Sequence, residues 1–161
     1  MNAILGELGK SPKFCEYIKN IEQKISPISI WGLNDVGAAQ ILQATAEFSK
    51  KPICIITYNE IQAKQIIENL KYFSDKIVYF PKKEIVTYDY VAESKNLPYE
   101  RIEALNQILR KRNLIVVTTI ESLMQKIPAK EVLYKNTLDF KVGDIYKIED
   151  LNRNWFSKSS Q

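Results

Sequence analysis

Short runs of β-branched and aliphatic residues, alternating with helical patterns, constrain this chain more than any other feature. The runs occupy residues 28–31, 52–57, 77–80 and 114–118, and most are separated by segments long enough for a helix. Parallel strands that lie side by side need crossover connections of this kind. The alternation therefore predicts an α/β fold with a doubly wound, mostly parallel sheet.

The segments between the runs carry apolar residues at helical spacing. Helices are expected over residues 11–24, 36–50, 59–73 and 98–111. Ser11 and Pro12 supply an N-cap and a proline at the first helical position. The unbroken apolar run at 52–57 predicts a strand covered on both faces. The stripe in the last of these helices predicts inward positions for Ile102, Leu105, Ile108 and Leu109.

A glycine turn between residues 28–31 and the next helix has the layout of a phosphate-binding P-loop. Gly32 and Gly37 have the spacing of its two glycines, while Ala38 and Ala39 stand where lysine and serine or threonine would be. The lysine neutralises phosphate charge and the hydroxyl binds Mg²⁺, and alanine can do neither. Asp35 would also repel an anion. The loop is therefore interpreted as a degenerate nucleotide loop that does not bind phosphate; an ordinary strand-to-helix turn is the simpler alternative.

The amino-acid composition excludes several kinds of catalytic and metal site. The 161 residues include no histidine, which excludes Ser-His, Cys-His and zinc-histidine sites. Cys15 and Cys54 lie in apolar patterns and are expected to be buried thiols of a reducing cytoplasm. No catalytic residue, metal site or cofactor is expected. No stretch is long and apolar enough to span a membrane, so the expected location is cytoplasmic.

Basic residues are the candidates for contact with nucleic acid. The net charge is only +4, far from a strongly basic coat. Such contacts could involve Lys82, Lys83, Arg110, Lys111 and Arg112. Each cluster also falls where a helix or strand is expected to end, so solvation and the helix dipole explain them equally well. Any DNA binding is expected to be weak and ionic.

The chain is expected to consist of three parts. An amphipathic helical region covers residues 1–25, the α/β lobe covers 26–128, and a second α+β module begins at 129 and continues to 161. A short helix near 129–134 and the period-two alternation at 137–143 mark the change of module. Residues 152–161 show no periodicity and predict a frayed tail.

In this order, the motifs resemble the first RecA-like lobe of a superfamily 2 helicase. More narrowly, they are similar to the N-terminal UvrB-homology region of the transcription-repair coupling factor family (Mfd). The matching segments are Thr-Tyr-Asn-Glu at 57–60, Phe-Pro-Lys-Lys-Glu-Ile-Val-Thr-Tyr-Asp at 80–89, 94–109 with Arg101-Ile-Glu-Ala-Leu, 115–128, and Leu-Asp-Phe-Lys-Val-Gly-Asp at 138–144. The resemblance spans roughly residues 12–151.

The resemblance implies a docking and autoinhibitory unit of DNA repair that is like UvrB with its ATP site erased. In the family, the ATP-dependent DNA translocase and the parts that meet RNA polymerase and DNA lie downstream. UvrA would bind through the second module, which begins near Thr137, if that module is complete. The expected continuation is missing after about Leu151. The alternative function is a DNA-binding or nucleotide-hydrolysing helicase lobe acting in its own right.

Overall fold

The computed structural model describes residues 3–83 and 96–136. In chain order the elements are α1 (Ala3–Leu8), α2 (Pro12–Glu22), α3 (Asp35–Ser49), β1 (Ile53–Thr57), α4 (Glu60–Lys71), β2 (Ile77–Phe80), α5 (Asn96–Arg110), β3 (Ile115–Thr119), α6 (Ile120–Met124) and α7 (Lys130–Asn136). Residues Met1–Gln125 form one compact unit, and Lys126–Gln161, which includes α7, form a second.

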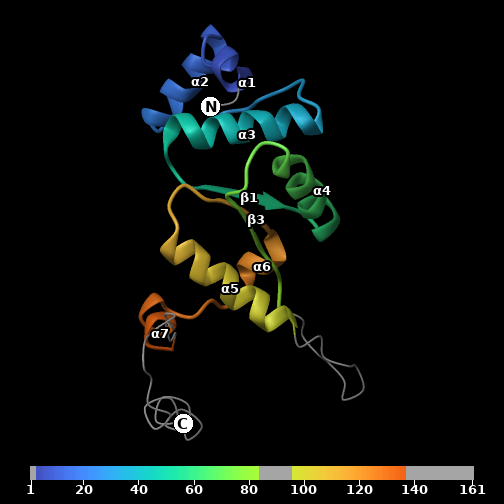
Figure 1. Cartoon of the computed structure of the whole chain (residues 1–161), viewed down its shortest axis with the longest axis vertical. Coiled ribbons are helices and arrows are strands. Elements are labelled where there is room, and N and C mark those ends of the chain that lie inside the picture. The colour runs from blue at the N-terminus through green and yellow to red at the C-terminus, as the bar shows by residue number, and fades with distance from the viewer. Residues whose placement is uncertain (1–2, 84–95, 137–161) are drawn as a thin grey trace, which may run out of the picture. The chain divides into compact units, whose positions relative to one another are not determined.

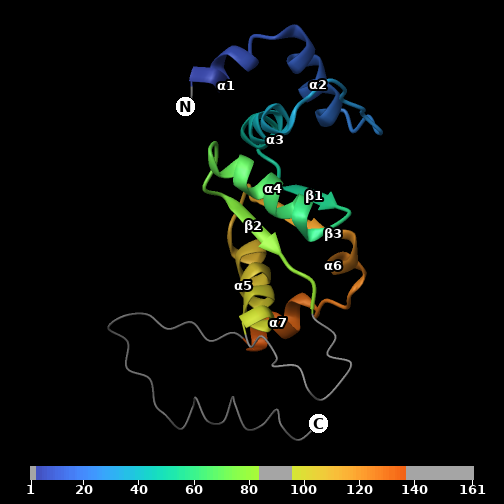
Figure 2. The ribbon, with the colours of Figure 1, turned by 90° about the vertical axis from the view of Figure 1, so that its right-hand side faces the viewer.

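The sheet of the first unit has three parallel strands in the order β1-β3-β2. Ile115 of the central strand β3 is in register with Ile53 of β1 and with Ile77 of β2. Helices α3 and α4 lie on one side of the sheet, and α5 and α6 lie on the other (Figures 1 and 2). The predicted parallel α/β class is confirmed, while the finer assignment to a RecA-like, doubly wound lobe stays a prediction.

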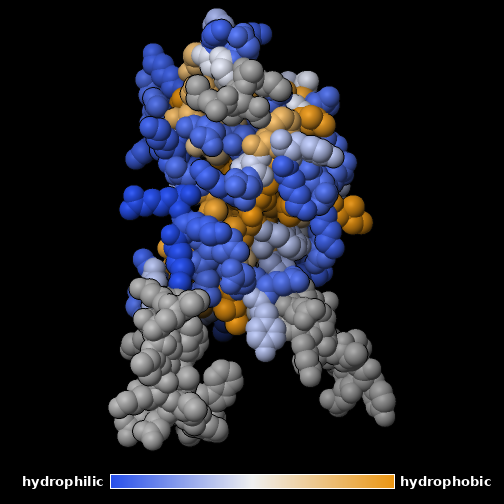
Figure 3. All heavy atoms as spheres, viewed as in Figure 1, coloured by the Kyte–Doolittle hydropathy of each residue, from blue (hydrophilic) through white to orange (hydrophobic). Residues whose placement is uncertain are grey.

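The main core lies between the sheet and the layer formed by α3 and α4. Its buried members are small or aliphatic: Ala39, Ala46, Ala63, Leu70, Ile115 and Val117. The small residues let the helices approach the sheet closely, and full burial of each larger aliphatic side chain contributes about 1.5–3 kcal/mol. Figure 3 shows apolar residues at the level of the sheet, between α3 and α5, with polar residues around them.

Helix starts follow the capping signals of the sequence. α2 begins at Pro12 with Ser11 at the N-cap position, as predicted, but the Ser11 side chain makes no capping hydrogen bond. The side chain of Asn59 caps α4, because its Oδ1 accepts a hydrogen bond from the Gln62 amide at 2.8 Å. This contact satisfies one of the backbone N–H groups that a helix start leaves without a partner.

The predicted strand at residues 28–31 is wrong. This segment has no regular structure, and the side chains of Ile30 and Trp31 are 47% and 88% exposed. Its apolar residues instead line an open cavity of about 370 Å³ together with Phe14 and Tyr17 of α2. A short apolar run is compatible with either arrangement, and here it faces a helix rather than a sheet edge.

Three predictions of burial are also wrong. β1 is an edge strand with exposed Cys54 and Ile56 on one face, and Cys15 is exposed as well. In α5 the expected inward residues Ile102 and Ile108 are 50% and 36% exposed. The cause is the same in β1 and α5, because α5 contacts the sheet chiefly beside β2 and leaves the corresponding face of β1 uncovered.

Several predictions fall outside the described residues. They are the strand at 137–143 and the tail at 152–161. The predicted short helix before 137 is confirmed by α7. In the described part of the chain, no helix is long and apolar enough to cross a membrane.

Candidate functional site

The glycine turn that leads into α3 is held by its own residues. Gly32 has φ of +81°, a left-handed conformation that favours glycine. Asn34 caps α3, and its Oδ1 accepts a hydrogen bond from the Gly37 amide at 2.7 Å. A Cβ atom on residue 37 would lie 2.9 Å from that oxygen. Both glycines therefore have a local backbone role.

The residues that replace the P-loop lysine and hydroxyl differ in their surroundings. Ala39 is only 2% exposed and belongs to the core between α3 and the sheet. Ala38 is half-buried. Asp35 is exposed in the first turn of α3, where Gln65 of α4 donates a hydrogen bond to its Oδ2 at 3.1 Å. The start of α3 therefore presents a carboxylate and a capping amide oxygen, with two methyl groups where a P-loop carries its cation and hydroxyl.

The basic candidates do not form one surface. Lys82 and Lys83 follow the carboxyl end of β2, whereas Arg110, Lys111 and Arg112 precede the amino end of β3. Because β2 and β3 are parallel neighbours, these two groups lie at opposite ends of the sheet. The structure separates the two clusters, so a single track of phosphates would have to cross the whole sheet to meet both.

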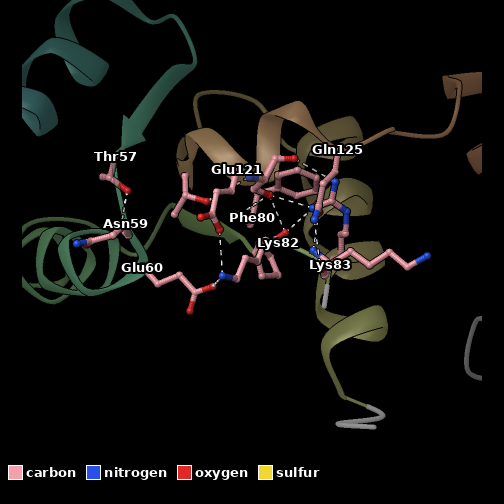
Figure 4. A network of polar contacts seen from close by, with 12 residues as sticks. Thr57, Asn59, Glu60, Phe80, Lys82, Lys83, Glu121 and Gln125 are labelled. Atoms are coloured by element: carbon pink, nitrogen blue, oxygen red, sulfur yellow. Dashed lines mark hydrogen bonds and ion pairs between the residues drawn. The ribbon is translucent and has the colours of Figure 1, made fainter. Parts of the chain in front are cut away.

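Lys82 is engaged by two carboxylates. Its Nζ lies 3.0 Å from Glu121 Oε2 and 3.6 Å from Glu60 Oε1 (Figure 4). The hydrogen bond and charge of Glu121, followed by the charge of Glu60, raise the pKa of Lys82 above its ordinary value. The pairing joins α4, the end of β2 and α6. Glu121 also lies in the first turn of α6, where a carboxylate is favoured by the helix dipole.

Lys83 is held through its backbone. Its amide donates to Gln125 Oε1 at 2.6 Å, and Gln125 Nε2 donates back to the Lys83 carbonyl at 2.9 Å. At the other cluster, Lys111 Nζ donates to Gln107 Oε1 at 3.1 Å. Arg110 also has an interaction partner, and all three basic residues of this cluster are exposed.

Arg101 of α5 is a buried charged side chain at the carboxyl end of the sheet. It is 8% exposed, and its guanidinium donates to the Pro81 carbonyl and, at 2.9 Å, to Ser122 Oγ. A further bond of 3.3 Å reaches the Ser122 carbonyl, and the Phe80 ring lies beneath the guanidinium. Burial lowers the pKa of Arg101, but arginine stays protonated in proteins. Backbone carbonyls and a ring face therefore surround a charged group in the interior.

Hydroxyl groups continue this network across the sheet. Ser122 Oγ donates to the Pro81 carbonyl at 2.7 Å, and Thr118 Oγ1 donates to the Phe80 carbonyl at 2.9 Å. Thr57 Oγ1 in turn reaches the Thr118 carbonyl at 3.2 Å. The carboxyl ends of all three strands are thus joined by side chains, and each of these three hydroxyl groups has a partner.

Sequence reasoning did not identify Arg101 or Ser122 as important. The sequence did contain a signal for the burial of Arg101. Ala104 and Leu105 follow it by three and four residues, so all three lie on the same face of α5, which the structure buries. A charged residue in a buried helical stripe needs a compensating partner. The sequence could indicate that need, but not that the carbonyls would come from residues 81 and 122.

The chemistry available at this network is limited. The two carboxylates near this network, those of Glu60 and Glu121, both pair with Lys82. The Thr118 and Ser122 hydroxyl groups donate hydrogen bonds to backbone carbonyls. In the described ranges, no three acidic, cysteine or histidine side chains gather closely enough to hold a metal ion. The geometry is that of a clamp that fixes α5 and α6 to the sheet.

The fold and the site together define an α/β protein with a parallel sheet. Its P-loop-like turn lacks the lysine and the hydroxyl side chain of a nucleotide-binding P-loop. Its sequence is similar to transcription-repair-coupling factors from three bacteria. The identity is 31% over 90 residues for Rickettsia bellii, which covers 54% of this chain, and 22% over 145 residues for Bacillus subtilis, which covers 89%. It is 27% over 97 residues for Rickettsia typhi, covering 58% of the chain. The chain is a distant homologue of these coupling factors (Mfd).

The chain spans a small part of these relatives. The matched residues make up 8% of the Rickettsia bellii protein, 9% of the Rickettsia typhi protein and 12% of the Bacillus subtilis protein. No family model and no solved structure matches the chain.

Proposed function

We propose that this chain is a docking and regulatory module of a transcription-repair coupling factor and that it neither binds ATP appreciably nor hydrolyses it. Residues 26–128 are its degenerate RecA-like lobe, preceded by a helical region at 1–25. Residues 129–161 begin a second module. Similarity to three coupling factors supports the family relationship on which this proposal rests.

The start of α3 is the observation that carries the proposal. A nucleotide loop needs free amide groups, a cation and a hydroxyl around the phosphates. Here the Gly37 amide is occupied by Asn34, and Ala38 and Ala39 supply neither a charge nor a metal ligand. The Asp35 carboxylate adds repulsion. Any remaining affinity should be no better than about 1 mM, which corresponds to roughly −4 kcal/mol.

Calorimetric titration with Mg-ATP tests the nucleotide part. We expect no saturable heat at sub-millimolar nucleotide and no release of phosphate. The matched variant Ala38→Lys, at a half-exposed position, restores the counter-charge alone and should still not hydrolyse ATP. The paired change Ala38→Lys with Ala39→Thr should not do so either, because a hydroxyl and a cation without acidic metal ligands do not make an ATPase. A micromolar dissociation constant for the unaltered chain contradicts the proposal.

UvrA is the proposed partner, and the second module is the proposed contact. On this view the chain should retain UvrA poorly, whereas a longer chain that continues through the module as in the relatives should retain it. RNA polymerase and DNA would be engaged by downstream parts of the long protein. A pull-down of UvrA with both chains decides the placement, and equal retention would locate the contact in residues 26–128 instead.

The alternative is a lobe that binds DNA or hydrolyses nucleotide by itself. The ion pairs of Lys82 and the separation of the two basic clusters favour the docking module over this alternative. Protein docking also needs no reactive side chain, in keeping with a polar network whose groups bond to one another.

A further inference from the structure

Basic side chains gather where the three strands begin. Each strand follows a helix, and the segments that lead into β1, β2 and β3 carry five exposed cations: Lys50, Lys51, Lys76, Lys111 and Arg112. Backbone hydrogen bonds hold these segments side by side. The Ile53 amide donates to the Leu114 carbonyl at 2.9 Å, and the Ile115 amide donates to the Lys76 carbonyl at 2.9 Å. In Figure 1, α3 and α5 both end on the left, where β1 begins, and Figure 3 shows hydrophilic residues on that side at the level of the sheet.

This end of the sheet carries more positive charge than the fold itself balances. The carboxyl ends of α3, α4 and α5 each present roughly half a negative charge, so the helix dipoles offset only about 1.5 of the five cations. Asp75 is the one acid in the same three segments. A surplus of roughly two positive charges therefore remains. Among the described residues, none of the five cations forms an ion pair, and Lys111 donates only to the neutral side chain of Gln107.

Lys50 has a backbone conformation that suits glycine better than lysine. It is the C-cap of α3 and lies in the left-handed region, with φ of +52° and ψ of +25°. Glycine is the usual residue in this conformation at a helix end, because it has no Cβ atom to clash with the backbone. The charge of Lys50 offsets part of that strain through the dipole of α3. A lysine at a position that favours glycine indicates that its charge has a use beyond the stability of the helix.

We propose that the amino ends of the strands form a docking surface for an acidic segment of a partner protein. The inference deepens the docking function proposed above and rests on it. Lys51, Lys76 and Arg112 supply donors for the carboxylates of such a segment. Tyr72, which follows α4 and is 82% exposed, supplies an apolar contact beside them. Asp75 disfavours a nucleic acid, which has a charge at every nucleotide, whereas a peptide can place a neutral residue opposite this carboxylate.

Fluorescence anisotropy with a labelled acidic peptide tests the surface. The probe is a peptide of about 12 residues, mostly glutamate with two phenylalanines, and the control peptide has glutamine in place of glutamate. At low salt we expect a dissociation constant of about 10–100 µM for the probe and no binding of the control. Lys51→Gln with Lys76→Gln should weaken binding at least about fivefold. Lys64→Gln with Lys83→Gln removes the same charge from exposed positions away from the strand starts, and should change the affinity less than about twofold.

Lys50→Gly separates binding from stability. Glycine relieves the left-handed backbone, so this variant should not unfold at a lower temperature, yet it should bind the acidic peptide several-fold more weakly. A lower unfolding temperature with unchanged peptide affinity would assign Lys50 to the helix alone and remove it from the surface.

Three results overturn the proposal. They are no binding of the acidic peptide up to about 1 mM, equal losses in the two double variants, and tighter binding of an oligothymidylate of equal charge that is weakened by Lys51→Gln with Lys76→Gln. The last result would identify a nucleic-acid site. Absent peptide binding, with the Mg-ATP and UvrA results as expected, overturns this surface alone. Micromolar binding of Mg-ATP overturns the proposed function instead, because that titration reports on the start of α3 and not on these lysines.

Discussion

The guanidinium carbon of Arg101 lies 4.1 Å from the centroid of the Phe80 ring, with α5 and β2 joined by this contact. The same guanidinium donates to carbonyl oxygens at the end of β2 and in α6. A cation held over a ring and bonded to carbonyls is stabilised without a carboxylate partner. This one side chain therefore links three elements at the carboxyl end of the sheet.

Removal of Arg101 should destabilise the first unit strongly. Arg101→Met keeps much of the apolar stem but removes the cation from the Phe80 ring and one donor from each of the Pro81 and Ser122 carbonyls, so we expect a loss of about 2–4 kcal/mol in unfolding free energy. Arg101→Lys keeps the charge but not the planar fork, and should recover less than half of the loss. Urea denaturation followed by circular dichroism measures both. Arg112→Met, at an exposed position, should change stability by no more than about 0.5 kcal/mol, and equal losses at the two positions would contradict the clamp.

The second prediction concerns Asn34, which caps the start of α3. Asn34→Ala removes the acceptor of the Gly37 amide and should cost about 1 kcal/mol of stability, while Asn34→Asp keeps an acceptor and should cost little. Asn59→Ala removes the equivalent bond in α4 and should give a loss of similar size. Thermal unfolding of the three variants provides the comparison. If Asn34→Asp were as damaging as Asn34→Ala, the hydrogen bond would not be the source of the effect.

The ion pairs of Lys82 should be visible in its titration. Because the folded pKa is raised above 10.5, the pairing contributes to stability in full below that pH, and the contribution is lost as pH rises through the folded pKa. NMR detection of the Lys82 side chain should give a midpoint above 10.5, and Glu121→Gln should lower it towards that value. Glu68→Gln breaks the separate pair with Lys71 and should not move the Lys82 midpoint. A midpoint unaffected by Glu121→Gln would exclude the contact.

Much of the fold could be predicted because local patterns and tertiary structure agree. The runs at 52–57, 77–80 and 114–118 form parallel strands, and Asn59 caps a helix, since β-branched runs and capping residues act over a few positions. The burial of individual faces could not be predicted in this way. Cys54, Ile56 and Ile102 are apolar yet exposed, because their burial depends on which helix covers which strand.

In the candidate site, too, some features could be predicted from the sequence and others depend on the tertiary structure. The replacement of lysine and hydroxyl by Ala38 and Ala39 could be recognised from spacing alone, because the chemistry of a P-loop depends on residue identity. The partners of Lys82 come from residues 60 and 121, far apart in sequence and brought together only by the sheet order. Ion pairs between residues so far apart in the sequence leave no periodic pattern from which they could be predicted. Arg101 was missed for a related reason, since its acceptors are backbone groups that every residue type has.

DNA binding should be weak and governed by salt. The two candidate clusters lie at opposite ends of the sheet, and Lys82 is already paired, so among these five candidates about three could contact the phosphates of one duplex, in the cluster that includes Lys111 and Arg112. The logarithm of the affinity should then fall with the logarithm of the salt concentration with a slope of about −3, with no sequence preference. Fluorescence anisotropy with labelled single- and double-stranded oligonucleotides measures this slope.

Substitutions at the two clusters separate ionic contact from a dedicated DNA site. Lys111→Gln with Arg112→Gln removes two exposed charges and should reduce the slope by about 2, because each phosphate contact releases about one counterion. Lys82→Gln is the matched change at a paired lysine and should alter the slope little. A specific interface would instead hold DNA in the submicromolar range at about 0.3 M salt, where a few surface contacts are largely screened. That result would favour a helicase lobe that binds DNA itself over a docking module.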